Sequence, residues 1–170
     1  MVIWVPGKKK ETNPDEDDMF FFTATVFDIS QTMEIAENLE SEKFPNMIIC
    51  LIGDLGSGKT IFTKGFANGL GIEENITSPT FNIIKEYTSG EMDLYHMDLY
   101  RLDGDVKNLG LDEYFTRDGV VIIEWADMIE DYLPEERLDI KFKVIDEYTR
   151  VLVFKPHGQK YEEICEEILW

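Results

Sequence analysis

The sequence predicts an α/β domain of three layers, in which helices cover a mixed, partly antiparallel sheet. A continuous apolar run over 47–52 is typical of a strand that is buried on both faces. Two pairs of strand-like segments are each joined by a short turn, 81–87 with 92–100 and 138–144 with 150–154. Such pairs predict hairpins, and hairpins make part of the sheet antiparallel.

The first 18 residues are predicted to be a mobile tail, and a single domain is expected over 19–170. The tail carries a basic run at 8–10, then Pro14 and an acidic run at 15–18, so it offers little apolar surface to bury. No apolar stretch follows the basic run, as a signal peptide would require. No apolar run in the chain reaches the roughly 18 residues of a membrane span, and a cytoplasmic location without membrane partners is therefore expected.

The other elements follow from apolar spacing and from turn residues. Aromatic and β-branched residues predict a strand over 20–27. Ser30, with Glu34 nearby, precedes the next helical pattern and is its expected cap. Met33, Ala36 and Leu39 would then share one face of that helix. The remaining expected elements are a helix over 59–70 that ends at glycines, a helix over 106–115, a strand over 120–123 and a helix over 159–169.

The charge balance and the cysteines exclude several classes of protein. There are 35 acidic and 16 basic residues, and the net charge of -19 repels phosphate backbones at long range. Tight, direct nucleic-acid binding is therefore not expected, and in RNA metabolism a more basic partner would hold the RNA. The acidity could equally serve solubility alone. Cys50 and Cys165 have neither metal-ligand spacing nor a disulfide framework.

Residues 53–60, Gly-Asp-Leu-Gly-Ser-Gly-Lys-Thr, match the pattern G-x-x-x-x-G-K-[ST] between a buried strand and a helix. Glycines let the backbone turn its N–H groups inward, and the helix start adds partial positive charge. Lys59 is expected to neutralise the β- and γ-phosphates, and the Thr60 hydroxyl to complete a Mg²⁺ shell. A glycine-rich turn with an ordinary surface lysine is the alternative. The sequence thus predicts a P-loop NTPase fold that binds ATP and Mg²⁺ through Asp54, Leu55, Gly56, Ser57, Gly58, Lys59 and Thr60.

A P-loop protein also needs a second group near Mg²⁺ and a group that positions water. Glu124 ends the apolar run 120–123, in the form of a Walker B strand with Glu in place of Asp. Asp98 ends another strand-like segment, and either carboxylate could instead be a solvated strand end. Thr80 lies about 20 residues after the P-loop lysine, where many P-loop proteins have a switch segment that senses the γ-phosphate. By itself this Ser-Pro-Thr stretch could also be a simple turn.

Four further residues allow both a functional and a structural interpretation. His96 could polarise water, although a lone histidine in a strand is more often structural. Trp125 follows Glu124 and could shield the site or pack in the core. Arg101 and Arg117 could contact phosphates or pair with the many carboxylates.

Four blocks in this order resemble the TsaE (YjeE) family, a bacterial ATPase family needed for threonylcarbamoyladenosine synthesis in tRNA. The blocks are Gly-Asp-Leu-Gly-Ser-Gly-Lys-Thr, Ser-Pro-Thr-Phe, Tyr-His-Met-Asp-Leu-Tyr-Arg-Leu and Ile-Glu-Trp. The resemblance covers about residues 27–154. It implies ATP at the loop, with Thr60, Asp98 and Glu124 around Mg²⁺ and Thr80 at the family's switch position. The chain departs from the family's common pattern at Ser57 and Ile61, and neither change argues against ATP binding.

The resemblance also implies which residues lie near the nucleobase and which proteins are the partners. Thr32 matches a threonine close to the base and sugar, and Arg150 matches an arginine that approaches the adenine. The family's partners are TsaB and TsaD, of which TsaD transfers the threonylcarbamoyl group to adenosine 37 of tRNAs that read codons starting with A. tRNA would then be reached only through the partners, and ATP turnover would support repeated use of the TsaB–TsaD pair.

Three alternatives belong to other functional classes. A small-molecule kinase usually brings several arginines over the phosphates, but this chain has no arginine-rich lid segment. A GTPase would carry the guanine-reading Asn-Lys-x-Asp segment, which is absent. A nucleotide-gated binding module, in which hydrolysis is incidental, overlaps with the ATPase hypothesis.

Overall fold

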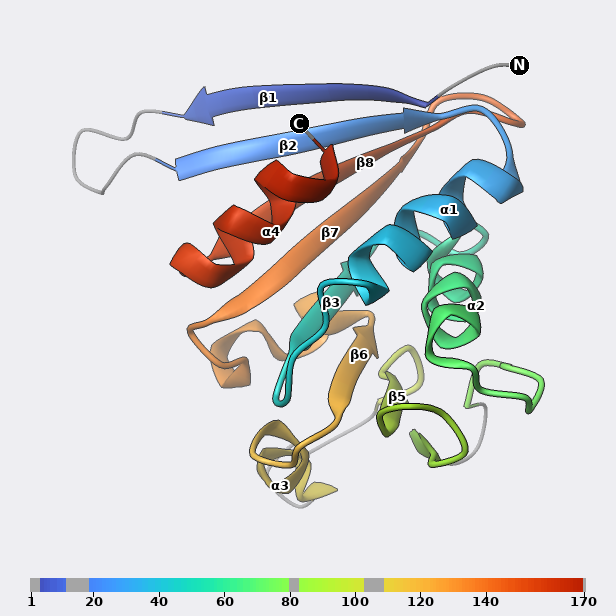
Figure 1. Ribbon diagram of the computed structural model, residues 1–170, viewed down its shortest axis with the longest axis vertical. Helices are drawn as coiled ribbons and strands as arrows, with labels where there is room; N and C mark the ends of the chain where they lie inside the picture. The colour runs from blue at the N-terminus through green and yellow to red at the C-terminus, as the bar shows by residue number, and fades with distance from the viewer. Residues whose placement is uncertain (1–3, 12–18, 80–82, 103–108, 170) are drawn as a thin grey trace.

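The computed structural model describes residues 4–11, 19–79, 83–102 and 109–169. The strands are β1 (Val5–Glu11), β2 (Met19–Val26), β3 (Ile48–Ile52), β4 (Ile84–Tyr87), β5 (Leu94–Asp98), β6 (Val120–Glu124), β7 (Arg137–Val144) and β8 (Arg150–His157). The helices are α1 (Ile29–Glu40), α2 (Lys59–Leu70), α3 (Leu111–Phe115), the 3₁₀ segment η2 (Ala126–Tyr132) and α4 (Gln159–Leu169). Within these described ranges, one eight-stranded sheet has the order β1-β2-β8-β7-β3-β6-β5-β4 (Figure 1).

The sheet is mixed, as the sequence predicts. The central strands β7, β3, β6 and β5 are parallel, whereas β1, β2 and β8 on one side and β4 on the other add antiparallel pairs. Both expected hairpins are present, as β4–β5 and β7–β8. Because the central strands are parallel, their carboxyl ends meet at one edge, where Glu124 pairs in register with both Leu51 and Asp98.

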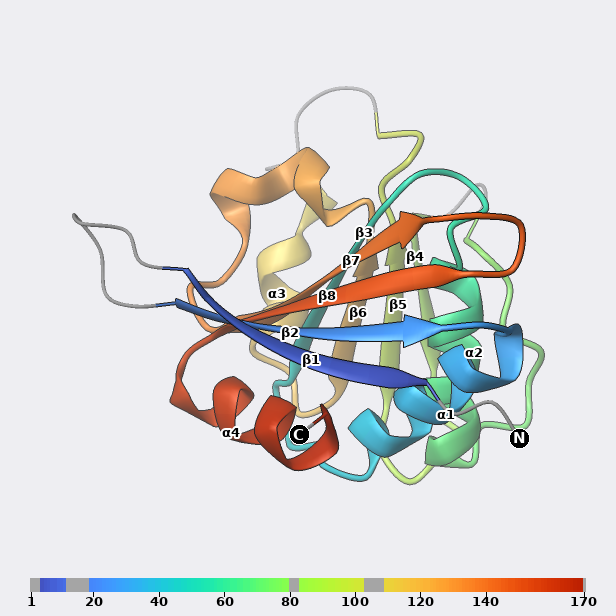
Figure 2. The same cartoon turned by 90° about the horizontal axis from the view of Figure 1, so that it is seen from above.

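Helices cover both faces of the central strands, so the fold has three layers. Along β3, Ile49 and Leu51 pack in one core with residues of α1, α2 and α4. Ile48 and Cys50 alternate with them and pack in a second core with residues of α3 and η2. Figure 2 shows α2 and α3 on opposite sides of β5 and β6. This alternation explains why the run over 47–52 is apolar throughout.

The first residues differ from the prediction of a mobile tail, because Val5–Glu11 forms edge strand β1. It pairs antiparallel with β2, from Val5 opposite Thr25 to Glu11 opposite Met19. Lys8 lies over the ring of Phe22 at 5.3 Å and pairs with Glu166 of α4 at 2.7 Å. Lysine and proline are well suited to an edge strand, which needs no apolar alternation on its open side. Residues 1–3 and 12–18 of the predicted tail lie outside the described residues.

Two helix boundaries also differ from the prediction. The cap of α1 is Asp28 and not Ser30, so the helix begins earlier than predicted, at Ile29. Asp28 accepts a hydrogen bond from the Gln31 amide at 2.9 Å. The Ser30 hydroxyl instead donates to Asp28, and this bond is the main reason why the pKa of Asp28 is lowered. Helix α3 covers only the end of the predicted helix 106–115, of which 106–108 lie outside the described residues.

Helices α1 and α2 pack against each other at very close range. A Cβ atom added to Gly65 of α2 would lie 2.8 Å from both the Cα atom and the carbonyl oxygen of Met33 in α1. This proximity holds the start of α1 beside the start of α2, at the edge of the sheet where β3 ends. No helix in the described part of the chain is long and apolar enough to cross a membrane.

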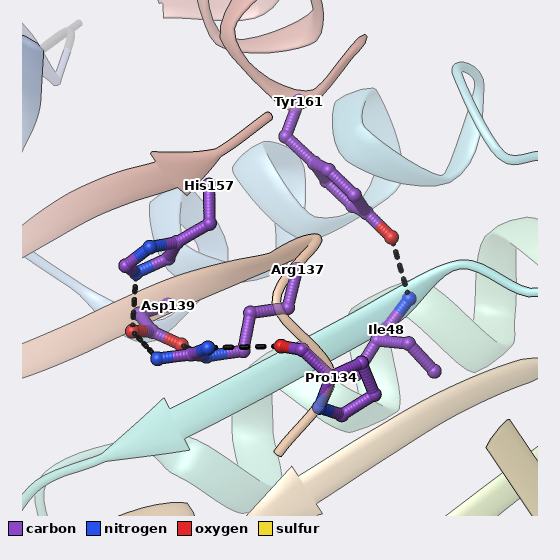
Figure 3. A network of polar contacts seen from close by, with 6 residues as sticks. All are labelled: Ile48, Pro134, Arg137, Asp139, His157 and Tyr161. Carbon is purple, nitrogen blue, oxygen red and sulfur yellow. Dashed lines mark hydrogen bonds and ion pairs between the residues drawn. The ribbon is translucent and has the colours of Figure 1, made fainter. Parts of the chain in front are cut away.

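An ion-pair network lies around the start of β7 and the end of β8 (Figure 3). Asp139 accepts from Nε of Arg137 at 2.9 Å and lies 2.8 Å from Nε2 of His157. Arg137 also donates to the carbonyl oxygen of Pro134 at 2.9 Å, which fixes the approach to β7. Burial would raise the pKa of Asp139, but the hydrogen bond with His157 and the charge of Arg137 outweigh it, so this pKa is lowered.

Helix α4 is joined to the centre of the sheet by one buried hydrogen bond. The Ile48 amide at the start of β3 donates to the hydroxyl of Tyr161 at 3.0 Å (Figure 3). Burial raises the pKa of Tyr161 to about 12, so this hydroxyl stays neutral. Both cysteines are free and buried, as expected for a pair without a disulfide framework.

Candidate functional site

The glycine-rich segment 53–60 connects the end of β3 to the start of α2. Gly56 and Gly58 have φ angles of 73° and 113°, in a region of backbone conformation that favours glycine. Gly58 caps α2 without any side-chain hydrogen bond. The first amides of α2 are therefore left for an external acceptor, and the helix start adds partial positive charge there. Together these features suit an anion such as phosphate.

Lys59 points its amino group into the loop. It donates to the carbonyl oxygens of Gly53 and Asp54, the latter at 3.0 Å, and lies 4.0 Å from the ring centroid of Trp125. Burial lowers the pKa of Lys59, while nearby carboxylates, led by Glu124, oppose this shift. Lys59 is thus a largely desolvated cation whose attraction to an anion is little screened by water.

Thr60 connects the loop to the neighbouring strands. Its hydroxyl donates to Oε1 of Glu124 at 3.0 Å and lies 3.1 Å from the hydroxyl of Ser78. Glu124 ends β6 and is buried, and its other oxygen contacts Nε2 of His96. Asp98 ends the adjacent strand β5 opposite Glu124, and burial raises its pKa despite a hydrogen bond from the Tyr100 amide. The structure therefore brings the hydroxyl and both predicted carboxylates to the same edge of the sheet.

These residues fit Mg²⁺ bound together with a phosphate better than a site made of protein alone. In the part of the chain that the structure describes, no group of three or more His, Cys, Asp or Glu side chains is arranged to hold a metal ion. Mg²⁺ typically takes one or two carboxylates and completes its shell with substrate phosphates and water. Thr60, Glu124 and Asp98 match that limited protein contribution.

Two cavities adjoin along the loop and share Gly56, Ser57, Gly58 and Ile61 in their linings. The larger has a volume of about 590 Å³, within the usual range for small-molecule sites. Its other lining residues are Asp28, Ile29, Ser30 and Thr32 from the start of α1, and Glu147, Tyr148 and Arg150 from the β7–β8 turn. The smaller has about 210 Å³ and is also lined by Leu55, Lys59, Thr60, Ser78, Asp98, Glu124 and Trp125.

The larger cavity contains both residues that were predicted near a base. Thr32 and Arg150 line it from opposite elements, although they are far apart in the sequence. The Arg150 guanidinium also holds the β7–β8 turn, because Nη1 donates to the carbonyl oxygens of Asp146, Glu147 and Thr149. Two further lining residues were not predicted from the sequence: Tyr148 and Ile29 are 69% and 61% exposed beside Arg150 and Thr32. Large apolar side chains at a turn and a helix start were the available signal for them.

The other residues that were singled out in the sequence lie in different surroundings. Thr80 lies outside the described residues, although Ser78 before it lines the smaller cavity. Arg117 pairs with Glu86 and Glu113, in agreement with the structural interpretation. Arg101 lines a third cavity of about 320 Å³, which shares Leu55, Ser78 and Asp98 with the smaller loop cavity. Trp125 both packs against a core cluster and lines the smaller cavity.

Comparison with known proteins gives the same family in several ways. A family model described as "Threonylcarbamoyl adenosine biosynthesis protein TsaE" matches residues 26–152. The tRNA threonylcarbamoyladenosine biosynthesis protein TsaE of Bacillus subtilis is 49% identical over 138 residues, which are 81% of this chain and 87% of that protein. The Haemophilus influenzae TsaE is 34% identical over 140 residues, 81% of this chain and 84% of that protein. The crystal structure of Bacillus subtilis YdiB superposes with a TM-score of 0.73 at 40% identity, covering 99% of this chain and 97% of that one.

Proposed function

The chain belongs to the TsaE family of threonylcarbamoyladenosine biosynthesis proteins, and from this premise we propose that it binds ATP with Mg²⁺ and hydrolyses it. One observation carries the proposal. The loop between β3 and α2 lies beside two strand-end carboxylates, and its Thr60 bonds to Glu124 at 3.0 Å. A glycine-rich turn without a nucleotide would not require this arrangement of hydroxyl, carboxylate and desolvated lysine.

Phosphate binding follows from the loop and the start of α2. The amides at the start of α2 would donate to the phosphates, and Lys59 would exchange its contacts with the Gly53 and Asp54 carbonyl oxygens for phosphate oxygens. The larger cavity takes the nucleoside, with Thr32 on one wall and Tyr148 and Arg150 on the other. Its predominantly apolar wall suits a nucleobase, and the nearby polar groups suit the ribose.

The Thr60 hydroxyl and the Glu124 and Asp98 carboxylates would hold Mg²⁺. When bound, the ion neutralises charge that develops on the phosphate oxygens. Water attacks the γ-phosphorus in line with the leaving β-phosphate oxygen, and Asp98 or Glu124 orients that water. Lys59 stabilises the charge that accumulates on the leaving oxygen.

Turnover by the isolated chain is expected to be slow. Among the described residues that line the smaller cavity, none is an arginine, so Lys59 is not assisted by an arginine finger from that wall. We propose that TsaB and TsaD homologues are the partners and that the ATP cycle changes how this acidic domain is held by them. The net charge of -19 supports a role in which the partners, rather than this chain, bind the tRNA.

Two variants test the site. Glu124→Ala and Asp98→Ala should each lower the rate of ATP hydrolysis by a factor of about 10²–10³, as expected when a charge-stabilising group is removed. Phosphate release is measured beside binding of ATP with and without Mg²⁺. Wild-type hydrolysis rates in both variants would refute the assignment of the site.

A separate measurement tests the partners and the alternative. Pull-down with TsaB and TsaD homologues, with and without ATP, should recover a complex, and failure in both states would refute the partner proposal. A small-molecule kinase remains the competing activity, and phosphorylation of a metabolite in a substrate screen would favour it. The linings of the two loop cavities argue against it, because the arginine they contain in the described residues is Arg150, which holds a turn.

A further inference from the structure

We propose that His96 is a positioning residue, which holds one oxygen of the Glu124 carboxylate so that the other faces Thr60. The inference deepens the proposed function, since it assigns a role beside the same Mg²⁺ site. It starts from a buried histidine that lines neither of the two cavities along the loop.

His96 and Glu124 extend from the same face of neighbouring strands. On β5, Leu94 packs in the core with α1 and α2, so His96 and Asp98, two and four residues later, lie on that face as well. On β6, Ile122 packs in the same core and Glu124 follows two residues later. In the parallel register His96 is opposite Ile122, which leaves its ring one step below the Glu124 carboxylate.

The two oxygens of Glu124 have different partners. Oε2 contacts Nε2 of His96, and Oε1 accepts the hydrogen bond from Thr60 at 3.0 Å. A glutamate has three rotatable side-chain bonds, so a carboxylate with only the Thr60 contact could adopt several orientations. Fixing Oε2 from the strand side leaves one orientation, in which Oε1 points to the start of α2.

The other ring nitrogen indicates which tautomer makes this contact. Nδ1 of His96 is buried and has no hydrogen-bond partner among the described residues. An N–H without an acceptor would be costly there, whereas a bare lone pair is cheaper to bury. The structure therefore assigns the proton to Nε2, which donates to Glu124.

The burial of His96 also argues against the role of polarising water, which the sequence alone had suggested. The side chain of His96 has 0% exposure, so it cannot polarise a water molecule in the smaller cavity directly. Among the described residues the hydrogen-bonding contact of its ring is with Glu124, so we assign its role through that carboxylate. Hydrogen-bond partners of metal-ligating side chains commonly change metal affinity or activity by about 10- to 100-fold when they are removed.

The test compares His96→Leu with His96→Gln, because a glutamine amide can present an N–H near the position of Nε2. His157→Leu is the matched control, since it removes the other histidine of the chain from a network remote from the loop. Each variant is measured for its melting temperature, for ATP binding in EDTA, and for the Mg²⁺ concentration that half-saturates ATP hydrolysis.

We expect His96→Leu to raise the half-saturating Mg²⁺ concentration by about 10- to 100-fold and to leave ATP binding in EDTA unchanged. His96→Gln should recover most of this loss, and His157→Leu should lower the melting temperature without changing the Mg²⁺ dependence. A wild-type Mg²⁺ dependence in His96→Leu would overturn the inference, as would equal impairment of the leucine and glutamine variants. Failure of the wild-type protein to bind ATP with Mg²⁺ would instead refute the proposed function.

Discussion

Replacing Gly65 with alanine should destabilise the protein, although alanine normally favours a helix. The residue lies in α2 where this helix crosses α1. A Cβ atom there would lie 2.8 Å from the Cα atom and the carbonyl oxygen of Met33 and 3.0 Å from Cβ of Ala36. Backbone atoms cannot rotate away from such a contact, so α1 would have to move as a unit.

The expected loss of stability in Gly65→Ala is the difference between two opposing effects. Alanine in a helix interior is favoured over glycine by about 1 kcal/mol. Inserting a methyl group into a well-packed interior costs about 1–3 kcal/mol. Because the contact is with helix backbone, we expect the upper part of that range and a net loss of about 1–2 kcal/mol. The start of α1 lines the larger cavity, so ATP affinity should fall as well.

Gly69→Ala supplies the matched control in the same helix. There the nearest atoms to an added Cβ all belong to the Glu40 side chain, the closest at 2.7 Å, and a side chain can rotate aside. This variant should cost less stability than Gly65→Ala, because the cost is limited to shifting the buried Glu40 side chain, which pairs with Lys43 at 2.8 Å. Urea denaturation with an unchanged m-value gives both free energies of unfolding. If Gly65→Ala proves as stable as Gly69→Ala, the close approach of α1 and α2 does not constrain the fold.

Two further predictions concern the base side of the site and the remote ion-pair network. Tyr148→Ala should weaken ATP binding by about 1–3 kcal/mol if the exposed ring stacks on the base; calorimetry measures this, and unchanged affinity would exclude stacking. Asp139→Asn should cost about 1.5–3 kcal/mol of stability near neutral pH, because it removes a charged acceptor from Arg137. The pKa of Asp139 is lowered in the folded state, so its contribution is present above the unfolded value near 3.9 and disappears as the pH falls through the lower folded pKa. Urea unfolding of the wild-type protein and of Asp139→Asn across this acid range measures how their difference in stability changes with pH. A difference that stays the same at the lowest pH would contradict the prediction.

Much of the fold could be predicted from local pattern. The buried run before the phosphate loop, the helix after it and the two hairpins each depend on neighbouring residues. Strand β1 could not be predicted in this way, because it forms by pairing with β2 and its sequence has no apolar pattern. The start of α1 differs from the prediction because Asp28, rather than Ser30, accepts a hydrogen bond from a helix amide.

The residues of the site also divide into those that a local pattern predicts and those that only the tertiary structure brings together. Lys59 and Thr60 could be predicted from the loop motif, and Asp98 and Glu124 because each ends a strand-like segment. The parallel pairing of β5 and β6 then brings the two carboxylates to one edge of the sheet. Tyr148 and Ile29 meet only through the tertiary fold, more than a hundred residues apart in the sequence. The contact between His96 and Glu124 depends on strand register, which no local pattern encodes.

The mixed sheet has a consequence for how this nucleotide site can change. One wall, with Arg150 and Tyr148, belongs to the antiparallel half, whereas Asp98 and Glu124 belong to the parallel half. Strand β3 and its loop lie between the two halves. Under the proposed function, base preference and hydrolysis would therefore depend on different parts of the fold, which have the phosphate loop in common. We expect substitutions in the 145–149 turn to change nucleotide preference without displacing Asp98 and Glu124.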